Sequence, residues 1–421
     1  MRAPTTTESP ITIAGLMRQV SWTDGVRQAS PKIARLLEKP FAEKALDFED
    51  GLQLSQAEGP DLIALLKVAN ELRRQTVGDA ITFVINRNLN FTNICTVGCA
   101  FCGFSRGPHS PDAYFHSHET LVEKAVEAAS LGATEVCIQG GLPRELSAYY
   151  YRDLLRTIRT ALPQIHIHAF SPMEIANGVE RTALPLRDYL LLLKDAGLGS
   201  IPGTAAEILD DEVRSTLSPN KLKVAQWIEI IRAAHALGIP TTSTMMYGHV
   251  EGPEHWVRHM LLLRQIQSET HGFTEFVPLG FIHSKTRLYR IGEARAGSSL
   301  KEHLKVHALA RLLLHGHIRN IQVSWVKMGF DHSLACLEAG ANDFGGTLME
   351  ESISKSAGAT FGESVSPDEF IALIRSISRT PAERTTTYRI RRTFEGGTEA
   401  APSCRLNHAI SSTRHAGADY W

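Results

Sequence analysis

Three cysteines lie within eight residues of the sequence, as Cys95, Cys99 and Cys102. Three thiolates in one loop suit a soft metal ion or an iron–sulfur cluster. A closed zinc site is the alternative, but it needs four ligands, usually from two paired clusters, and there is no second cysteine pair. The nearest residues that could supply a fourth ligand are His109, His116 and His118. Three cysteines on a four-iron cluster leave one iron open, and an open iron can bind a substrate.

The other three cysteines are scattered singly. Cys137 lies in an apolar strand-like run, Cys336 in an apparent helix and Cys404 in a polar segment. A lone cysteine is usually a small buried hydrophobe. We therefore expect these three to take no part in the chemistry.

The composition narrows the class of protein. The 421 residues include 44 Lys+Arg and 45 Asp+Glu, and 43% are hydrophobic, which is typical of a globular chain with ample core. The near-zero net charge argues against a nucleic-acid partner held by bulk electrostatics. No apolar run approaches the roughly 20 residues that cross a bilayer, and residues 1–10 lack a signal-peptide core. We expect a cytoplasmic protein, where disulfides are uncommon, so the cysteines need another explanation.

The elements around the cysteines alternate between strand and helix patterns. The expected strands are 81–91, 135–139, 165–171, 200–202, 241–247, 274–279, 321–326 and 342–344. The expected helices are 119–131, 149–161, 186–196, 224–237, 253–267, 300–314, 334–339 and 367–377. Strands separated by helices imply parallel pairing, and about eight such units predict a (β/α)8 barrel of the TIM type. An open doubly wound sheet is the alternative, but no Gly-x-Gly-x-x-Gly follows the first strand.

A glycine follows four of the helices, at Gly132, Gly197, Gly238 and Gly340, where a left-handed residue can end a helix. The predicted organisation has four parts. Residues 1–30 form a loose lead-in, 31–80 a helical extension, 81–392 the barrel and 393–421 a disordered tail.

Active sites of barrels lie at the carboxyl ends of the strands, and the cysteines come just after the first strand. Their spacing, with an aromatic residue before the last cysteine, resembles the radical S-adenosylmethionine (SAM) superfamily. The resemblance implies a 4Fe–4S cluster whose open iron chelates the amino and carboxylate groups of SAM. It also implies an external electron donor, whose electron cleaves SAM to a 5′-deoxyadenosyl radical.

Other strand ends supply candidates for binding SAM. By resemblance, Gly140 and Gly141 after the second strand bind its amino group, although an ordinary turn would also use glycines there. Phe101 has three interpretations: its ring packs on the cluster, its backbone is exposed to the adenine of SAM, or it is an ordinary residue of the hydrophobic core. The remaining candidates follow the third and fourth strands and are His168, Ser171, Glu174 and Glu207. Glu207 could equally be an acid in the first turn of a helix.

The later strand ends are polar and could hold a polar, aromatic substrate. The weak catalytic candidates are Tyr247, His249, Glu275 and Lys327. Trp325 or Tyr247 could stack on a ring. For His249, a structural histidine with its hydrogen bonds satisfied is the favoured interpretation.

Several longer segments resemble one subfamily. They are residues 86–95, 169–174, 201–212, 243–249, 274–279, 322–327 and 340–351. They are similar to the CofH subunit of the 7,8-didemethyl-8-hydroxy-5-deazariboflavin (FO) synthase system over roughly residues 50 to 392, with departures at Ala100 and Gly103. The resemblance implies transfer of the 4-hydroxybenzyl group of L-tyrosine to 5-amino-6-(D-ribitylamino)uracil, with release of 2-iminoacetate. A separate CofG-type radical SAM subunit would then close the deazaflavin ring.

Two other functions stay open at this point. Aminofutalosine synthase and related enzymes of menaquinone synthesis share the barrel and the cluster. A non-catalytic electron-transfer protein would normally tie all four irons to cysteine. Substrate-dependent cleavage of SAM distinguishes the first alternative, and the missing fourth cysteine argues against the second.

Overall fold

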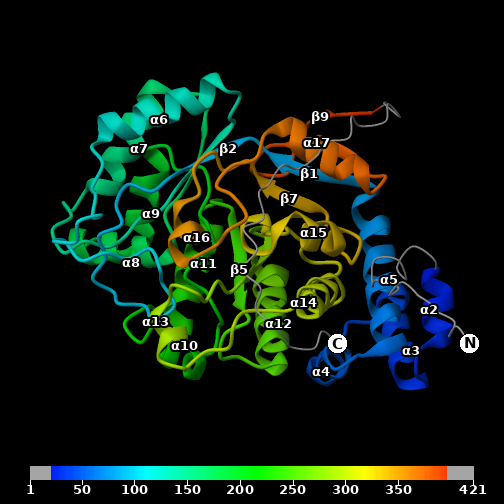
Figure 1. Ribbon diagram of the computed structural model, residues 1–421. Helices are drawn as coiled ribbons and strands as arrows, with labels where there is room; N and C mark the ends of the chain where they lie inside the picture. Colours follow the sequence, from blue (N-terminus) through cyan, green and yellow to red (C-terminus); the bar gives the residue numbers. More distant parts are fainter. Residues whose placement is uncertain (1–19, 396–421) are drawn as a thin grey trace, which may run out of the picture.

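The computed structural model describes residues 20–395, and predictions for residues 1–19 and 396–421, including Cys404, lie outside them. The chain begins with a helical layer, which lies at the right of Figure 1. Its elements are α2 (Trp22–Gln28), α3 (Pro31–Glu38), the 3-10 turn η1 (Pro40–Ala42), α4 (Phe48–Ser55) and α5 (Gly59–Val77). The loose lead-in predicted up to residue 30 is wrong for α2, which Ser21 caps and which packs closely on α5 at Gly25.

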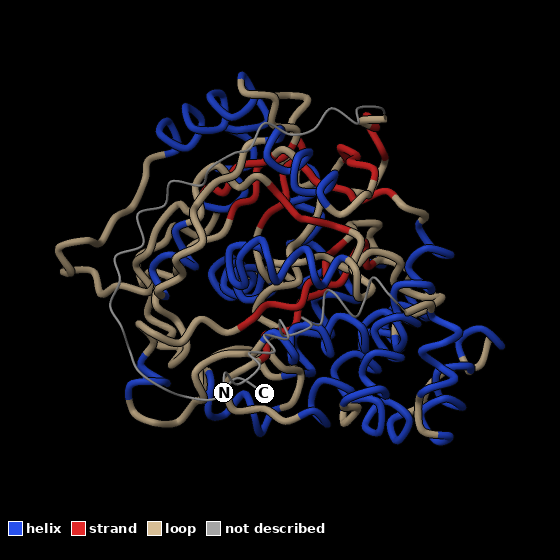
Figure 2. The backbone as a smooth tube through the Cα atoms, turned by 45° about the vertical axis from the view of Figure 1, so that its right-hand side comes forward, coloured by secondary structure: helices blue, strands red, loops and turns tan. Residues whose placement is uncertain are grey.

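A parallel barrel follows the helical layer. Its strands are β1 (Ala80–Val84), β2 (Asn86–Leu89), β3 (Glu135–Ile138), β4 (His166–Ala169), β5 (Thr241–Tyr247), β6 (Phe273–Gly280) and β7 (Asp343–Gly346). Pairing runs from β2 to β3 and β4 and from β5 to β6, and β7 pairs with β1. Figure 2 shows these strands in the middle of the molecule, with helices around them.

Two of the predicted strands are reduced to single bridges. Residues 200 and 201 bridge β4 to β5, and residues 321 and 322 bridge β6 to β7. Pro202 ends the first of them because it has no N–H to donate. The second ends where Trp325 begins a helix, so the strand predicted over 321–326 is too long. With β1 and β2 as one interrupted strand, the described residues close an eight-stranded barrel, which confirms the predicted fold.

The barrel helices are those that the sequence predicts, with additions. They are α6 (His118–Ser130), α7 (Tyr150–Ala161), α8 (Pro172–Thr182), α9 (Leu186–Asp195), α10 (Asp211–Leu217), α11 (Val224–Ala236), α12 (Pro253–Thr270), α13 (Arg287–Arg290), α14 (Leu300–Leu313), α15 (Trp325–Leu337), α16 (Ser352–Ala357) and α17 (Pro367–Ser376). Gly132 and Gly238 have φ of +92° and +68°, so they end α6 and α11 as predicted. Across residues 20–395, no helix is both long enough and apolar enough to cross a membrane.

Two strands near the end of the described chain were not predicted. β8 (Thr380–Arg384) pairs in parallel with β1, and β9 (Ile390–Thr393) pairs antiparallel with β8. β8 lies along the first half of the interrupted strand, while β3 pairs with the second half. The segment after β8 therefore reaches the interior of the barrel at the end opposite the cysteines.

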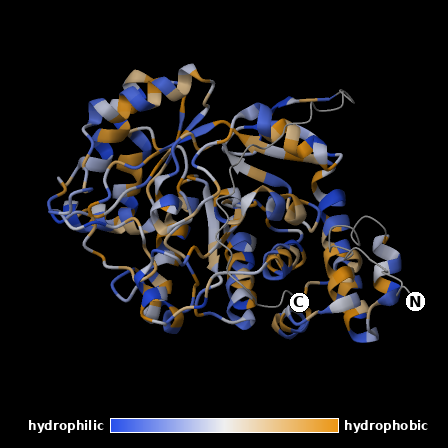
Figure 3. Ribbon diagram, in the orientation of Figure 1, coloured by the Kyte–Doolittle hydropathy of each residue, from blue (hydrophilic) through white to orange (hydrophobic). Residues whose placement is uncertain are grey.

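The helical layer and one half of the barrel share a hydrophobic core. Leu54 and Leu65 of the layer belong to the same buried cluster as Leu309 of α14. A Cβ on Gly51 of α4 would lie 2.7 Å from Val257 of α12, so these two helices touch backbone to side chain. In Figure 3 hydrophobic and hydrophilic residues interleave along these helices, as expected where one helix face is buried.

Candidate functional site

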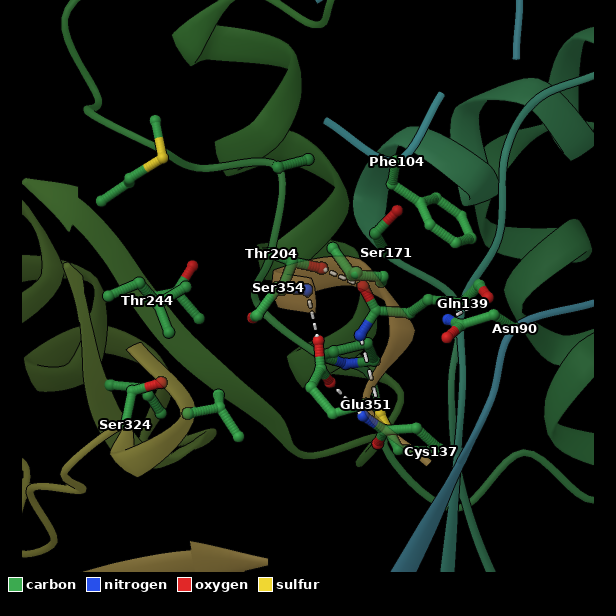
Figure 4. Close-up of a pocket in the computed structure, with 18 of the residues that line it drawn as sticks. Asn90, Phe104, Cys137, Gln139, Ser171, Thr204, Thr244, Ser324, Glu351 and Ser354 are labelled. Carbon is green, nitrogen blue, oxygen red and sulfur yellow. Dashed lines mark hydrogen bonds between the residues drawn. The ribbon is translucent and has the colours of Figure 1, made fainter. Parts of the chain in front are cut away.

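A cavity of about 430 Å³ opens inside the barrel at the carboxyl ends of the strands. Along several strands every second residue faces it, as the alternation of side chains in a barrel requires. These residues are Asn86, Asn88 and Asn90; Glu135, Cys137 and Gln139; Thr242, Thr244 and Met246; Glu275, Val277 and Leu279; and Gln322 and Ser324. Figure 4 shows Asn90, Gln139, Thr244 and Ser324 around this space.

All three clustered cysteines line the cavity, and none forms a disulfide. Their loop is fixed through Ala100, whose N–H donates to Leu217 O (2.9 Å) and whose carbonyl accepts from Leu288 N–H (2.8 Å). Burial raises the pKa of Cys99 to about 12. A thiolate at this position therefore needs a bound cation to stabilise it.

The donor set fits a cluster better than a zinc ion. Among residues 20–395, no three His, Cys, Asp or Glu side chains converge closely enough to hold a metal ion. A cluster of several irons holds its thiolates farther apart than one ion does. The rings of His116 and His118 pack on Tyr114 and Tyr150, with centroids 4.6 and 5.0 Å apart. Neither histidine lines the cavity, and exposed His109 does not either.

Gly140 and Gly141 lie between β3 and the cysteine loop. A Cβ on Gly140 would lie 2.6 Å from the ring of Phe91, and one on Gly141 would lie 2.2 Å from the carbonyl oxygen of Ile94. The N–H of Gly141 donates to Thr92 O at 2.8 Å. Both residues line the cavity, and packing under the loop is enough to require glycine at each.

Ser171 and Glu174 form a capping box at the start of α8. The Glu174 carboxylate accepts from the N–H and hydroxyl of Ser171 at 2.7 Å each, and from the N–H of Gly140 at 3.0 Å. Burial raises the pKa of Glu174 to about 7. The carboxyl therefore ties the end of β3 to the end of β4.

Glu207 lies in the loop before α10, with φ of +42°, so it is not a first-turn acid. It forms ion pairs with Lys221 (2.7 Å) and Arg214 (3.6 Å). The Lys221 ammonium also lies 5.2 Å from the centre of the Phe101 ring. Glu207, Lys221 and Phe101 thus form one group beside Cys99, and Lys221 was not predicted.

His168 points into the cavity from β4. Its Nδ1 lies 2.6 Å from the hydroxyl of Ser200, which also contacts Nε2 of His166 at 2.7 Å. Burial lowers the pKa of His168 to about 4. The imidazole is therefore neutral at neutral pH.

Tyr247 and His249, two of the catalytic candidates, are not among the residues that line the cavity. Residues 242, 244 and 246 of β5 face inward, and Tyr247 therefore faces outward, where its hydroxyl lies 2.6 Å from Nδ1 of His303. His249 is buried, with Nε2 2.9 Å from Met246 O. It is the structural histidine that the sequence favoured.

Trp325 is also unavailable for stacking on a substrate. Its ring stacks on Phe330 in the core, and its Nε1 donates to Gly346 O at 3.0 Å. Stacking on a substrate ring would need that face open to the cavity.

Glu275 lines the cavity, at its floor. It accepts a hydrogen bond from the hydroxyl of Tyr388 and lies 3.8 Å from Arg384, which pairs with Asp343 through Nη2 and Oδ1 at 2.9 Å. Burial raises the pKa of Glu275 to about 7. Arg384 and Tyr388 were missed because they follow the last strand that was predicted.

Lys327 also lines the cavity, from the first turn of α15. Its Nζ donates to the hydroxyl of Ser354 at 3.1 Å, and burial lowers its pKa.

Cys137 lies on the cavity wall rather than in the apolar core that the sequence suggested. It accepts from the Gln139 amide at 3.6 Å, and burial raises the pKa of its thiol. The signal for the inward residues is a polar side chain at every second strand position, as in Asn86-Arg87-Asn88-Leu89-Asn90.

Comparison with known proteins gives two family matches. Residues 89–263 match the radical SAM superfamily, and residues 270–396 match the CofH/MqnC C-terminal region. The chain is 50% identical over 355 residues to the 5-amino-6-(D-ribitylamino)uracil–L-tyrosine 4-hydroxyphenyl transferase of Methanothermobacter thermautotrophicus, covering 83% of this chain and 97% of that enzyme. For the enzyme of the same name in Methanocaldococcus jannaschii, identity is 49%, over 83% and 98% of the two chains.

A longer relative is the FO synthase of Mycobacterium leprae, 53% identical over 82% of this chain. The chain spans only 40% of that protein's length. Among solved structures, methylornithine synthase superposes with a TM-score of 0.64 at 19% identity, over 82% of this chain and 97% of that one. The FeFe-hydrogenase maturase HydG from Carboxydothermus hydrogenoformans gives 0.65 at 15%, over 90% and 86%. At these identities the two structures support the barrel fold alone.

Proposed function

The chain belongs to the family of 5-amino-6-(D-ribitylamino)uracil–L-tyrosine 4-hydroxyphenyl transferases, and we propose that it joins the 4-hydroxybenzyl group of L-tyrosine to that uracil and releases 2-iminoacetate. The observation that carries the proposal is a relative at 50% identity that bears this name and is matched over 97% of its length. The cysteine triad at the mouth of a closed barrel is the second support.

Membership of the radical SAM superfamily implies a 4Fe–4S cluster and SAM. We assign Cys95, Cys99 and Cys102 as the cluster ligands, because all three thiols line one cavity. When bound, the two cofactors supply a carbon radical that takes a hydrogen atom from tyrosine. The barrel walls keep water and the C–H groups of other molecules away from this radical.

On the side of β3 and β4, SAM would lie against Gly140 and Gly141, with His168 neutral and able to share a hydrogen bond. Ser171 and Glu174 hold this edge in place by joining the two strand ends. Glu207 and Phe101 close the side next to Cys99. These roles follow from the family and from the way each side chain lines the cavity.

The other wall of the cavity is available for the substrates. Glu275, Gln322 and Ser324 present an acid, an amide and a hydroxyl from neighbouring strands. Such groups suit the hydrogen-bonding edge of a uracil and a ribityl chain.

The FO synthase of Mycobacterium leprae is more than twice as long as this chain, whose described residues form one barrel with one cysteine triad. We propose that a separate CofG-type radical SAM subunit closes the deazaflavin ring. An external donor supplies the electrons. The reaction takes place in the cytoplasm, where free thiols persist.

Anaerobic reconstitution followed by mass spectrometry tests the function. The reconstituted enzyme with SAM, a reductant, L-tyrosine and the diaminouracil should form the adduct and 5′-deoxyadenosine together. If SAM cleavage depended instead on a menaquinone precursor and no adduct formed, the chain would be assigned to the aminofutalosine synthases and the proposed function would be wrong.

A further inference from the structure

The cavity contains one ammonium group that forms no ion pair with any of residues 20–395. Three lysines or arginines line it within the described chain, namely Lys221, Lys327 and Arg384. Lys221 pairs with Glu207 at 2.7 Å, and Arg384 pairs with Asp343 at 2.9 Å. Within the part of the chain that the structure describes, the hydrogen-bond partner of the Lys327 ammonium is the hydroxyl of Ser354, at 3.1 Å.

Glu351 and the thiol of Cys102 both act on Lys327 through space, and among the described residues neither forms an ion pair with it. The two oxygens of Glu351 accept from the N–H of Ser354 (2.7 Å) and from the amide of Asn88 (2.5 Å). Figure 4 shows the Ser354 bond to Glu351 within the ring of cavity residues. A charge held inside a protein without a close partner is costly, so this arrangement suits an anion that arrives with a ligand.

The surroundings of the ammonium fit a carboxylate. The hydroxyl of Ser354 lies beside the ammonium, and a hydroxyl together with one ammonium can satisfy both oxygens of a carboxylate. Lys327 follows the bridge at residues 321–322, which is the seventh of the eight strand positions when β1 and β2 count as one. Ser171 and Glu174 follow β4, the third position, so they lie across the barrel from Lys327.

We propose that Lys327 binds the α-carboxylate of the amino-acid substrate, an inference that rests on the proposed function. Of the substrates and SAM in that function, L-tyrosine and SAM carry a carboxylate, and the ribitylaminouracil has none. The position of Lys327 across the barrel from Gly140 and Glu174 favours tyrosine. Lys327 is thus a binding residue that orients tyrosine towards the cysteine loop.

The test compares Lys327→Met with Lys327→Arg in the reconstituted holoenzyme. Equilibrium dialysis measures labelled L-tyrosine and labelled SAM separately, and L-tyrosine amide serves as the ligand without a negative charge. We expect Lys327→Met to weaken tyrosine binding roughly 10- to 100-fold, the range for losing one charge-assisted hydrogen bond. Binding of SAM and of the amide should change less than about twofold, and Lys327→Arg should recover most of the tyrosine affinity.

The matched control is Lys355→Met. Lys355 lies on α16 beside Ser354 but is exposed and pairs with Glu363, so its loss should change neither ligand. Iron content and SAM binding report whether each variant is folded.

Two results would overturn the assignment of Lys327. One is loss of SAM binding with tyrosine binding intact, which would make this the SAM carboxylate site. The other is no change in either ligand. A wild-type holoenzyme that binds SAM but neither binds tyrosine nor forms the adduct would overturn the proposed function, and this inference with it.

Discussion

Single residues set how closely the cysteine loop packs on the barrel. Gly141 has no space for even one methyl group, because a Cβ there would overlap the Ile94 carbonyl beside Cys95. A Cβ on Gly107 would have open space around it, and the one neighbour within 4 Å would be the Ser110 hydroxyl, at 3.7 Å. The two positions therefore separate an effect of packing from an effect of losing glycine.

Gly141→Ala should displace the cysteine loop and lower iron loading by about half or more, while costing only about 1–3 kcal/mol of global stability. Gly107→Ala should match the wild type in both. Iron assays and urea unfolding of the two variants measure this, and normal iron loading in Gly141→Ala would show that the loop tolerates the shift.

Each cysteine of the triad should be indispensable to the cluster. Cys95→Ala, Cys99→Ala and Cys102→Ala should each fall from about four irons per chain to near zero, because a two-thiolate site no longer holds a cubane. Cys137→Ser and Cys404→Ser are the controls and should keep their iron. Iron analysis and the visible absorption spectrum give the readout, and iron loss in either control would mean that the ligand set is wrong.

The triad could be found from sequence because its members are neighbours. Lys221 and Glu207 are 14 residues apart, and Arg384 meets Asp343 across 41 residues, so nothing local marks either pair. The outward position of Tyr247 follows from strand alternation, which depends on the register of β5. Register was not determined by the hydrophobic pattern because polar side chains face inward here.

At the level of elements, β8 and the turn after it form the floor of the cavity. Arg384 at the end of β8 lies between Asp343 and Glu275, and Thr386 donates to Glu135 at 2.6 Å. The strand was not predicted because Pro381 occupies its second position and proline usually argues against a strand.

Arg384→Met should destabilise the protein by about 3–5 kcal/mol, since it leaves two buried carboxylates without their cation. Exposed Arg389→Met, in the following turn, should stay within about 0.5 kcal/mol of the wild type. Denaturant unfolding at pH 7 measures both. Equal stability of the two variants would show that the floor does not depend on this ion pair.

The loop between β5 and α12 is fixed by Glu251, which accepts from the N–H groups of Gly248 (2.6 Å) and His249 (2.8 Å) and pairs with Arg295 (2.8 Å). Burial opposes ionisation of Glu251, but His249, Gly248 and Arg295 outweigh it and lower its pKa to about 2.

A lowered pKa means that the carboxylate stabilises the fold above its ordinary pKa of 4.5, and that this stability is lost as pH falls towards 2. Glu251→Gln should therefore cost roughly 2–4 kcal/mol at pH 7 and progressively less below pH 4.5. Unfolding curves at several pH values check this. A cost that does not depend on pH would mean that packing, not charge, is what the substitution removes.

Most of the barrel could be predicted because eight strand patterns alternate with helices ended by glycine. The two segments that became bridges, at 200–201 and 321–322, are shortened by Pro202 and by the start of α15. The limit at Pro202 follows from that residue's own chemistry, whereas the local pattern does not show where α15 begins.

At the scale of the whole molecule, the helical layer and the barrel belong to one body. α5 packs against α14, and their buried leucines form a common cluster. The sequence predicts residues 31–80 as a helical extension, and the shared core predicts that they unfold together with the barrel.

Hydrogen exchange with mass spectrometry tests this cooperativity. Peptides from α5 and α14 should exchange through openings of the same free energy, with the same dependence on denaturant. If α5 exchanged at clearly lower free energy, the layer would be an independent unit resting on the barrel.

The pairing of β1 has a consequence for the order of assembly. Ala80 lies opposite Thr380, and Thr82 lies opposite both Ala382 and Asp343. The first barrel strand therefore pairs with residues that come 261 to 300 positions later in the chain. On the ribosome, β1 emerges long before either neighbour and must remain unpaired while the rest of the protein is translated. Contacts this distant in sequence are slow to form and leave strand edges exposed meanwhile. The nascent chain therefore needs protection from aggregation until its final strands emerge, and the floor of the cavity is the last part of the barrel to be made.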